Sequence, residues 1–211
     1  VDWLHTCDSE FNMPAHHAEA VCEELVRRGL SEKVRWYAYC PPRPFSRRLA
    51  GLMRRAGCVG IDFGVDSGDD DMLQRLGRDF TAQDLREVAH ICHQEGITFM
   101  YDLLLGGPGE TRETVRTTIE LMRELCPSRV GVAVGLRIYP GTPLVGMVRR
   151  DGLAPDNPHL QGRILGNADL LAPIFYLSAD LGPDALPFIG HLIGGDERFF
   201  FGGAEREEAD Y

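Results

Sequence analysis

The segment 102–114 reads DLLLGGPGETRET, an apolar strand pattern that runs through glycine and proline directly into a helix pattern. The first N–H groups of a helix lack partners within it and carry partial positive charge, so this turn could bind an anion or the polar edge of a cofactor. The loop lacks the Gly-Lys-Ser/Thr ending of a P-loop and the spacing of GxGxxG. An ordinary strand-to-helix turn therefore remains the alternative to a ligand-binding loop.

Asp102 is a carboxylate inside the apolar run FMYDLLLGG. A carboxylate in a buried strand is costly unless it is paired or lies at the mouth of a ligand site. Asp102 is therefore the strongest functional candidate that the residues themselves offer.

The elements that must position these residues alternate regularly along the chain. Five strand-like runs recur about every 30 residues, the size of a βαβ unit, with one helix pattern between neighbours. This order predicts an α/β fold with a parallel sheet and right-handed crossovers. Periodicity does not decide between a doubly wound sheet and a (β/α) barrel. In both folds the active site lies at the carboxyl ends of the strands. The expected strands are 1–6, 34–39, 59–65, 97–105 and 130–138.

The expected strand ends carry glycine, proline or carboxylates, which would ring one mouth of the sheet. After Gly152 the alternation is lost, and proline-rich segments and short apolar runs follow. We expect an irregular C-terminal extension over 151–211, either packed against the sheet or leading to a missing region. The strand ends read CDSEFN at 7–12, YCPPR at 39–43, GVDSG at 64–68, LGGPGE at 105–110 and RIYPGTP at 137–143.

The composition bounds the class of protein. A chain of 211 residues with 44% apolar residues can form one substantial core, and its net charge of -10 argues against a nucleic-acid partner. It contains no apolar run of membrane-spanning length and begins with neither a signal nor a transit peptide pattern, so we expect a cytoplasmic protein without a membrane span. Because it opens on valine within an expected strand, we also expect upstream residues to be missing.

The cysteines do not form a metal or disulfide pattern. No two of them have CxxC or CxxxC spacing, which argues against a zinc site and a disulfide framework. We expect most to be buried thiols, and we predict no metal-ligating residue in this chain. The six are Cys7, Cys22, Cys40, Cys58, Cys92 and Cys126.

Four segments, read in order, resemble the radical S-adenosylmethionine superfamily, and within it the branch that often carries a cobalamin-binding domain. They are DSEFN, AGCVGIDFGVDSGDDDMLQRLGRDFT, GITFMYDLLLGGPGETRETVRTTIEL and LRIYPGTPL. The resemblance covers 1–150 and implies a partial (β/α) TIM-like barrel containing its second to sixth strands. It leaves 151–211 unassigned.

The resemblance implies residues for the methionyl end of S-adenosylmethionine. Asp8, Ser9 and Glu10 match the motif that holds the amine, where a carboxylate suits an ammonium group. Arg78 matches the arginine that pairs with the carboxylate, where a planar guanidinium is better than a lysine. From the residues alone, Asp8 and Glu10 equally fit a helix N-terminal cap, and Arg78 a surface position near a helix end.

The resemblance also implies residues for the nucleoside end. Asp66, with Ser67 beside it, matches a polar contact near the ribose or carboxylate, while Asp69, Asp70 and Asp71 are better explained as a helix start. Asp102 and Leu104 lie on one side of a strand and match contacts to ribose and adenine. No catalytic residue is identified. The wall near the adenine would comprise Gly106, Gly107 and Pro108.

The chain departs from the family pattern at its defining motif. The CxxxCxxC that binds a 4Fe-4S cluster is absent, and its usual place precedes the first expected strand. We therefore expect a fragment that begins at the second barrel strand and is inactive alone. Cobalamin follows only from the branch resemblance, and YCPPR stands where some relatives have a carboxylate.

The implied function is that of a radical enzyme. The cluster would donate one electron to the sulfonium, and the 5'-deoxyadenosyl radical would abstract hydrogen from a small-molecule or peptide substrate. An electron donor such as flavodoxin or ferredoxin is implied, and cobalamin would make methyl transfer the outcome. Two alternatives remain: a cobalamin-free enzyme such as a methylthiotransferase, and a non-catalytic barrel remnant that binds a ligand. An aldolase-type barrel would need a lysine or histidine that the strand ends lack.

Overall fold

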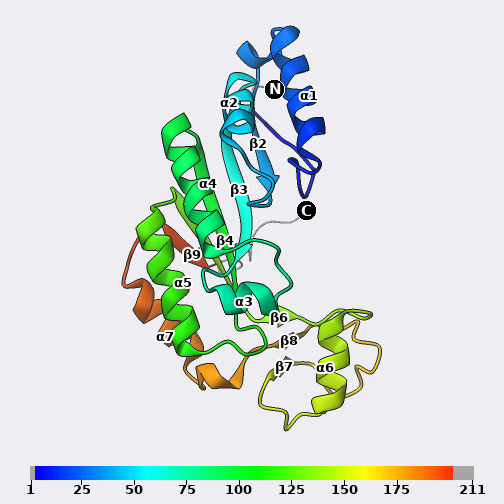
Figure 1. Cartoon of the computed structure of the whole chain (residues 1–211). Coiled ribbons are helices and arrows are strands. Elements are labelled where there is room, and N and C mark those ends of the chain that lie inside the picture. The colour runs from blue at the N-terminus through cyan, green and yellow to red at the C-terminus, as the bar shows by residue number, and fades with distance from the viewer. Residues whose placement is uncertain (1–2, 202–211) are drawn as a thin grey trace.

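The computed structural model describes residues 3–201, which form a six-stranded parallel sheet with strand order β1-β2-β3-β4-β5-β9 (Figure 1). Each of the five expected strand runs overlaps one of these strands, which confirms the predicted α/β class. The sheet curves but does not close into a barrel, as the partial-barrel prediction requires. The strands are β1 Trp3–His5, β2 Arg35–Cys40, β3 Cys58–Asp66, β4 Thr98–Leu105, β5 Arg129–Val134 and β9 Phe199–Phe201.

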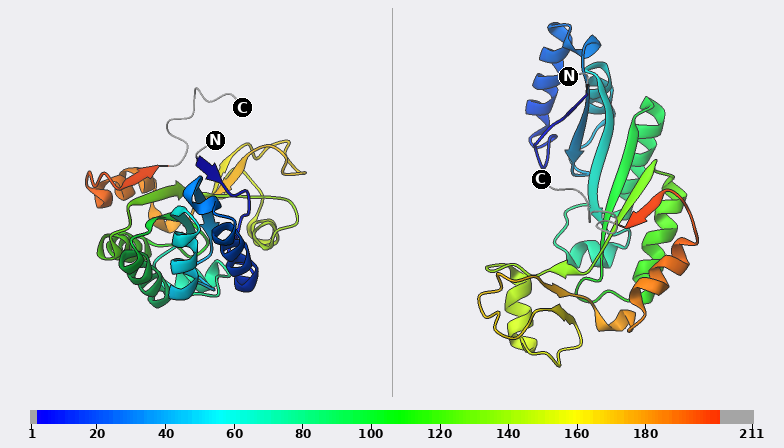
Figure 2. Two further views of the ribbon diagram at one scale, coloured as in Figure 1. Left: turned by 90° about the horizontal axis from the view of Figure 1, so that it is seen from above. Right: turned by 180° about the vertical axis from the view of Figure 1, so that it is seen from behind.

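The long helices lie side by side on one face of this sheet, and within residues 3–201 the other, concave face carries no helix (Figure 2). A short helix α3, Asp70–Arg75, follows β3, and single 3-10 turns lie at Leu30–Glu32 and Ala179–Leu181. The covering helices are α1 Ala15–Arg27, α2 Arg47–Arg55, α4 Ala82–Glu95, α5 Arg112–Leu125 and α7 Ala185–Ile193.

Local sequence signals fix several of the helix ends. Thr81 and Asp84 form a reciprocal capping box at the start of α4, and Gly96 ends that helix in the left-handed conformation at φ 65. Asp69 caps α3 by accepting a hydrogen bond from the Met72 N–H at 3.0 Å. These three ends agree with the caps and the acidic helix start that the sequence predicts.

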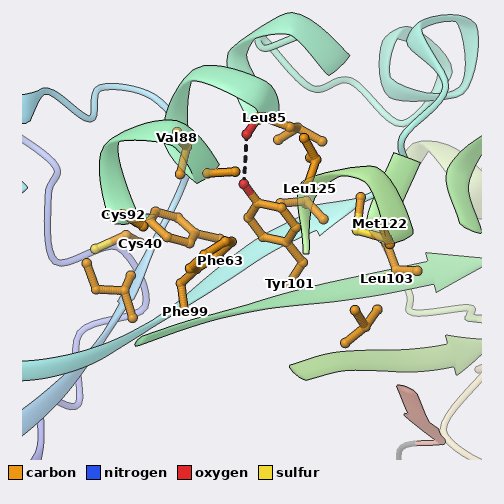
Figure 3. Close-up of a cluster of buried hydrophobic side chains, with 14 of the residues drawn as sticks. Cys40, Phe63, Leu85, Val88, Cys92, Phe99, Tyr101, Leu103, Met122 and Leu125 are labelled. Carbon is orange, nitrogen blue, oxygen red and sulfur yellow. Dashed lines mark hydrogen bonds between the residues drawn. The ribbon is translucent and has the colours of Figure 1, made fainter. Parts of the chain in front are cut away.

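The main core lies between the sheet and the covering helices (Figure 3). Alternate residues of each strand point into it, because successive side chains of a strand face opposite sides of the sheet. Tyr101 of β4 is fully buried there, with its ring edge-on to Phe63 and Phe99. Its hydroxyl donates a hydrogen bond to the Leu85 carbonyl of α4 at 2.8 Å, which ties that helix to the sheet.

Removing this hydroxyl is expected to destabilise the protein slightly. Tyr101→Phe keeps the ring contacts and loses one buried hydrogen bond, so the free energy of unfolding should fall by about 1 kcal/mol in urea denaturation. Tyr139→Phe removes the hydroxyl of an exposed tyrosine and is the matched control. Equal stability of the Tyr101 variant and the control would show that the bond to α4 contributes nothing.

The fifth expected strand, 130–138, is in fact two strands, which corrects that prediction. Gly135 has φ 89, a conformation that favours glycine, and the chain turns there from β5 into β6, Leu136–Arg137. Strand β6 joins a separate antiparallel sheet with order β6-β8-β7. This sheet packs with α6, Pro143–Asp151, around its own apolar cluster; the other two strands are β7 Leu160–Gly162 and β8 Ile174–Tyr176.

The segment after residue 150 contributes to both sheets. It provides β7 and β8 to the small sheet, and α7 and β9 return to the parallel sheet, where Val130 of β5 is in register with Phe199 of β9. The division of the chain at residue 150 stays a prediction. Within residues 3–201, no helix is both long and apolar enough to cross a membrane.

Candidate active site

The concave face of the parallel sheet carries a row of polar and aromatic side chains. Its members alternate with the core residues, so they point away from the helices. Tyr39 of β2 is in register with Asp62 of β3, and Gly64 of β3 is in register with Asp102 of β4. Asp62 and Asp102 therefore share this face at diagonal positions on neighbouring strands.

The two carboxyl groups perturb each other. Burial, the nearby Asp102 charge and a hydrogen bond to Asp102 raise the pKa of Asp62 to about 7. Burial also raises the pKa of Asp102, while the hydrogen bond from Asp62 lowers it in part. Sequence reasoning singled out Asp102 and missed Asp62, although a carboxylate between the buried Ile61 and Phe63 carries the same signal.

Glycines on both sides give the Asp102 carboxyl its room. A Cβ atom at Gly64 would meet no atom within 4 Å, so the floor beside Asp102 on β3 is open. A Cβ at Gly131, its register partner on β5, would lie 2.0 Å from Asp102 Oδ1. Glycine is therefore required at position 131 for the observed direction of Asp102.

Asp66 and Arg78 pair with each other at the end of β3. The Arg78 Nε donates to Asp66 Oδ2 at 2.6 Å, and its Nη2 lies 2.5 Å from the same oxygen. The pairing of β3 with β4 is irregular between Gly64 and Asp66, and Asp66 itself has φ 61. This irregularity changes the direction of the Asp66 side chain at the mouth of the sheet. The structure brings these two predicted site residues together and leaves 38% of the Arg78 side chain exposed.

Ser67 is placed elsewhere. Its side chain is fully buried, lies 3.1 Å from the Thr118 hydroxyl of α5 and accepts a hydrogen bond from the Asp69 N–H at 3.1 Å. These contacts join the loop after β3 to α5, on the helix side of the sheet. The cofactor contact of Ser67 stays a prediction, and these bonds engage its hydroxyl with the protein itself.

The GGPGE loop after β4 is closed on itself by Glu110. This carboxylate is fully buried and accepts hydrogen bonds from the Gly106 N–H at 2.7 Å and the Thr114 hydroxyl at 3.2 Å. Burial raises its pKa, and hydrogen bonds from Gly106, Thr114 and Gly107 lower it. The loop amides that could have bound an anion thus have an internal acceptor, a role for Glu110 that sequence reasoning missed.

The same loop is tightly packed, and its role as a wall near the adenine stays a prediction. Gly106 has φ 96, and a Cβ there would lie 2.4 Å from a Leu177 methyl carbon. The Ser178 N–H donates to the Gly106 carbonyl at 2.9 Å. Gly107 is buried and Pro108 half-buried in this turn, while Leu104 is half-buried on the face of β4 that carries Asp102.

Asp8, Ser9 and Glu10 are exposed in the loop between β1 and α1. The cap of α1 is Pro14, and no side chain forms a capping hydrogen bond there, so the helix-cap interpretation of Asp8 and Glu10 is wrong. The three residues lie at the carboxyl end of β1, at the same end of the sheet as Asp66.

Asn12, which follows this loop, is a further polar residue that sequence reasoning did not assign. It is fully buried, and its Nδ2 donates to the carbonyls of Pro41 at 3.0 Å and Pro44 at 2.5 Å. The Phe11 N–H donates to the Tyr39 carbonyl at 2.8 Å. These bonds hold the loops after β1 and β2 together at the mouth of the sheet.

The concave face of β1 and β2 is aromatic. Trp3 stacks on Tyr37 with ring centroids 5.8 Å apart, and His5 lies 4.6 Å from Tyr39. Tyr37 also covers Gly60, where a Cβ would lie 2.7 Å from its ring. An aromatic half of the face thus borders the acidic half formed by Asp62 and Asp102.

Four of the cysteines are buried thiols, in agreement with the prediction for most of the six, and Cys7 and Cys126 are exposed. Burial raises the pKa of Cys22 and Cys92 to about 12 in each case. Within residues 3–201, His, Cys, Asp and Glu side chains form no group of three that could hold a metal ion.

Residues 5–122 match the family described as the radical SAM superfamily, which is more than half of the chain. The chain therefore belongs to that superfamily, and the sequence resemblance is confirmed. It is 35% identical over 149 residues to tryptophan 2-C-methyltransferase from Streptomyces laurentii, which covers 65% of this chain and 25% of that protein. It is 27% identical over 120 residues to a probable threonylcarbamoyladenosine tRNA methylthiotransferase from Methanocaldococcus jannaschii, covering 56% and 23%.

Solved structures of TsrM, a radical S-adenosylmethionine methyltransferase from Kitasatospora setae, share the fold. The complex with tryptophan and the analogue aza-SAM has a TM-score of 0.80 and 28% identity, covering 93% of this chain and 44% of that one. The form with cobalamin and a [4Fe-4S] cluster has a TM-score of 0.81, also at 28% identity, covering 94% and 45%. The chain thus spans a quarter of the Streptomyces methyltransferase and less than half of the TsrM chain.

Proposed function

We propose that this chain is the greater part of the barrel of a cobalamin-dependent radical S-adenosylmethionine methyltransferase that acts on a small aromatic molecule. The observation that carries the proposal is the similarity to TsrM over 93% of the chain at a TM-score of 0.80. The TsrM structures contain tryptophan, an S-adenosylmethionine analogue, cobalamin and a [4Fe-4S] cluster. The match to the methylthiotransferase covers less of the chain, and a net charge of -10 disfavours a tRNA substrate.

The residues present fit S-adenosylmethionine. An acidic concave face with an open glycine floor at Gly64 suits a ribose, whose hydroxyls would donate to Asp102, and Leu104 offers an apolar contact to the adenine. Arg78 would bind the methionyl carboxylate, with Asp66 orienting its guanidinium, and the loop with Asp8, Ser9 and Glu10 would receive the amine. Bound S-adenosylmethionine supplies the methyl group or the 5'-deoxyadenosyl group of the reaction.

The residues present do not fit the cluster. The buried thiols belong to the core, and within residues 3–201 no three ligating side chains come together. We infer that the cysteines that hold the cluster are not among the six in this chain, and that the chain alone is inactive. A one-electron donor such as flavodoxin or ferredoxin and a cytoplasmic location belong to the same proposal.

The aromatic half of the concave face supports an aromatic substrate. Exposed rings of Trp3, Tyr37 and Tyr39 offer faces and edges against which a planar ring could pack. Such a ring would lie beside the acidic half of the face, where the cofactor is proposed to bind. Tryptophan is the substrate in the TsrM complex and is the first molecule to test.

Substituting Arg78 tests the cofactor site. S-Adenosylhomocysteine carries the methionyl carboxylate and methylthioadenosine does not, so Arg78→Ala should weaken binding of the first by roughly tenfold or more and leave the second nearly unchanged in calorimetric titration. Arg78→Lys should give an intermediate loss, because a lysine cannot form the planar fork. Arg116→Ala, on the exposed surface of α5, is the control. An equal loss for both ligands, or none, would contradict the proposed role.

A further inference from the structure

We propose that Asp62 is a positioning residue for Asp102, donating a hydrogen bond that holds the Asp102 carboxylate over the glycine floor, where it receives a ribose hydroxyl of the cofactor. The inference rests on the proposed function, because it takes the cofactor to lie at Asp102. Asp62 itself is not assigned a contact to cofactor or substrate.

The strand geometry confines Asp102 between two neighbours. On the β5 side its Oδ1 lies over Gly131, 2.0 Å from the place of a Cβ atom. On the β3 side, Gly64 is its register partner, and Asp62, two residues earlier, points to the same face. The carboxyl group thus lies between Gly131, where a Cβ atom would displace it, and the side chain of Asp62.

The surroundings of Asp62 identify it as the donor. Its Oδ1 is buried and has no hydrogen-bond donor among residues 3–201. A buried carboxyl oxygen without a donor is best satisfied when the group carries a proton and donates to a neighbouring acceptor. Asp102 is that acceptor, and the raised pKa of Asp62, about 7, agrees with this assignment. Two carboxylates in contact cannot both be ionised without mutual repulsion.

The other charged and titratable groups around the pair do not supply a counterion. From β2 and β1, Tyr39 and His5 lie on the same face, and from β3 the Asp66 carboxylate is paired with Arg78. From β5, Arg129 lies over the Phe200 ring of β9 at 5.0 Å. No ion pair to Asp62 or Asp102 forms in the described part of the chain, so a proton on Asp62 would be what reduces their repulsion.

Binding of S-adenosylhomocysteine to the full chain between pH 5.5 and 8.5, followed by calorimetry, tests the inference. The wild-type affinity should fall roughly tenfold as the pH rises through 7, because Asp62 loses the proton that it donates. Asp62→Asn retains an N–H donor at every pH and should bind with the wild-type affinity of pH 6 throughout. Asp62→Ala should bind roughly tenfold more weakly at pH 6. Glu113→Gln, an exposed charge change on α5, should follow the wild type.

Two results would overturn the inference: Asp62→Ala binding as tightly as the wild type at pH 6, or Asp62→Asn retaining the wild-type pH dependence. A carbon-detected NMR titration of the ligand-free chain separates this failure from failure of the proposed function. Asp62 should titrate near pH 7 in the wild type and at lower pH in Asp102→Asn. An ordinary Asp62 titration refutes the hydrogen bond whatever the ligand does. If instead the Asp62 pKa is raised and Asp102→Ala binds S-adenosylhomocysteine as tightly as the wild type, the contact between Asp102 and the cofactor is refuted.

Discussion

Asp62→Asn is expected to stabilise the protein above pH 7 by about 2 kcal/mol relative to the wild type. In the folded chain the pKa of Asp62 is raised from 3.8 to about 7 by burial, by the Asp102 charge and by their hydrogen bond. This pKa difference between the unfolded and folded chains corresponds to about 4 kcal/mol of unfolding free energy. Because the pair is partly exposed, solvent screening reduces this figure to about half. Asparagine avoids this cost because it never ionises.

The sign follows from proton counting. Between pH 4 and pH 7 the folded chain keeps the Asp62 proton, whereas the unfolded chain has lost it. The folded state therefore binds more protons, and the free energy of unfolding falls as the pH rises through this window and levels off above it. Paired surface carboxylates have the opposite effect on the free energy of unfolding. The pKa of Glu24 is lowered to about 2 by Arg27 and Arg28, so its stabilising contribution is lost only as the pH falls below about 4.5.

Urea denaturation at pH 5, 6, 7 and 8 measures this effect. The difference in unfolding free energy between Asp62→Asn and the wild type should grow from pH 5 to pH 7 and then stay constant. Glu113→Gln removes an exposed carboxylate and should give a difference that does not change across the range. A constant difference for Asp62→Asn would show that Asp62 has an ordinary pKa in the folded chain.

The sequence was sufficient for the order and type of the main elements because their signals are local. The alternation of apolar runs identified five strands, and the Thr81 and Gly96 signals located both ends of α4. The break at Gly135 was missed because the apolar pattern continues through it. Only the pairing of Leu136 with Tyr176, forty residues later, places β6 in another sheet. Such long-range pairing has no local signature.

The site was only partly predictable for a similar reason. Asp102 could be identified because a carboxylate in a buried strand is costly wherever the strand lies. Its relation to Asp62 depends on the register of β3 and β4, and that register shifts at an irregularity between Gly64 and Asp66. The pairing of Asp66 with Arg78 depends on how the chain turns through α3.

Glu110→Ala is expected to lower the free energy of unfolding by about 3 kcal/mol. The Glu110 carboxylate is fully buried and accepts hydrogen bonds from Gly106 at 2.7 Å and Thr114 at 3.2 Å. Alanine leaves the Gly106 N–H without an acceptor in a turn where Leu177 already fills the space next to the backbone. Glu110→Gln should cost less, about 1 to 2 kcal/mol, because its amide oxygen can still accept from the Gly106 N–H, whereas its NH₂ group cannot accept the hydrogen bond from the Thr114 hydroxyl.

Urea denaturation of both variants checks this ranking, with Glu113→Ala as the control. Glu113 lies three residues further along the chain with 78% of its side chain exposed, and its loss should change stability by less than about 0.5 kcal/mol. Glu110→Ala matching that control would mean that water replaces the carboxylate and that the loop amides are accessible. In that case the turn could bind an anion after all, and the Gly106 and Gly107 amides would be open to a polar ligand.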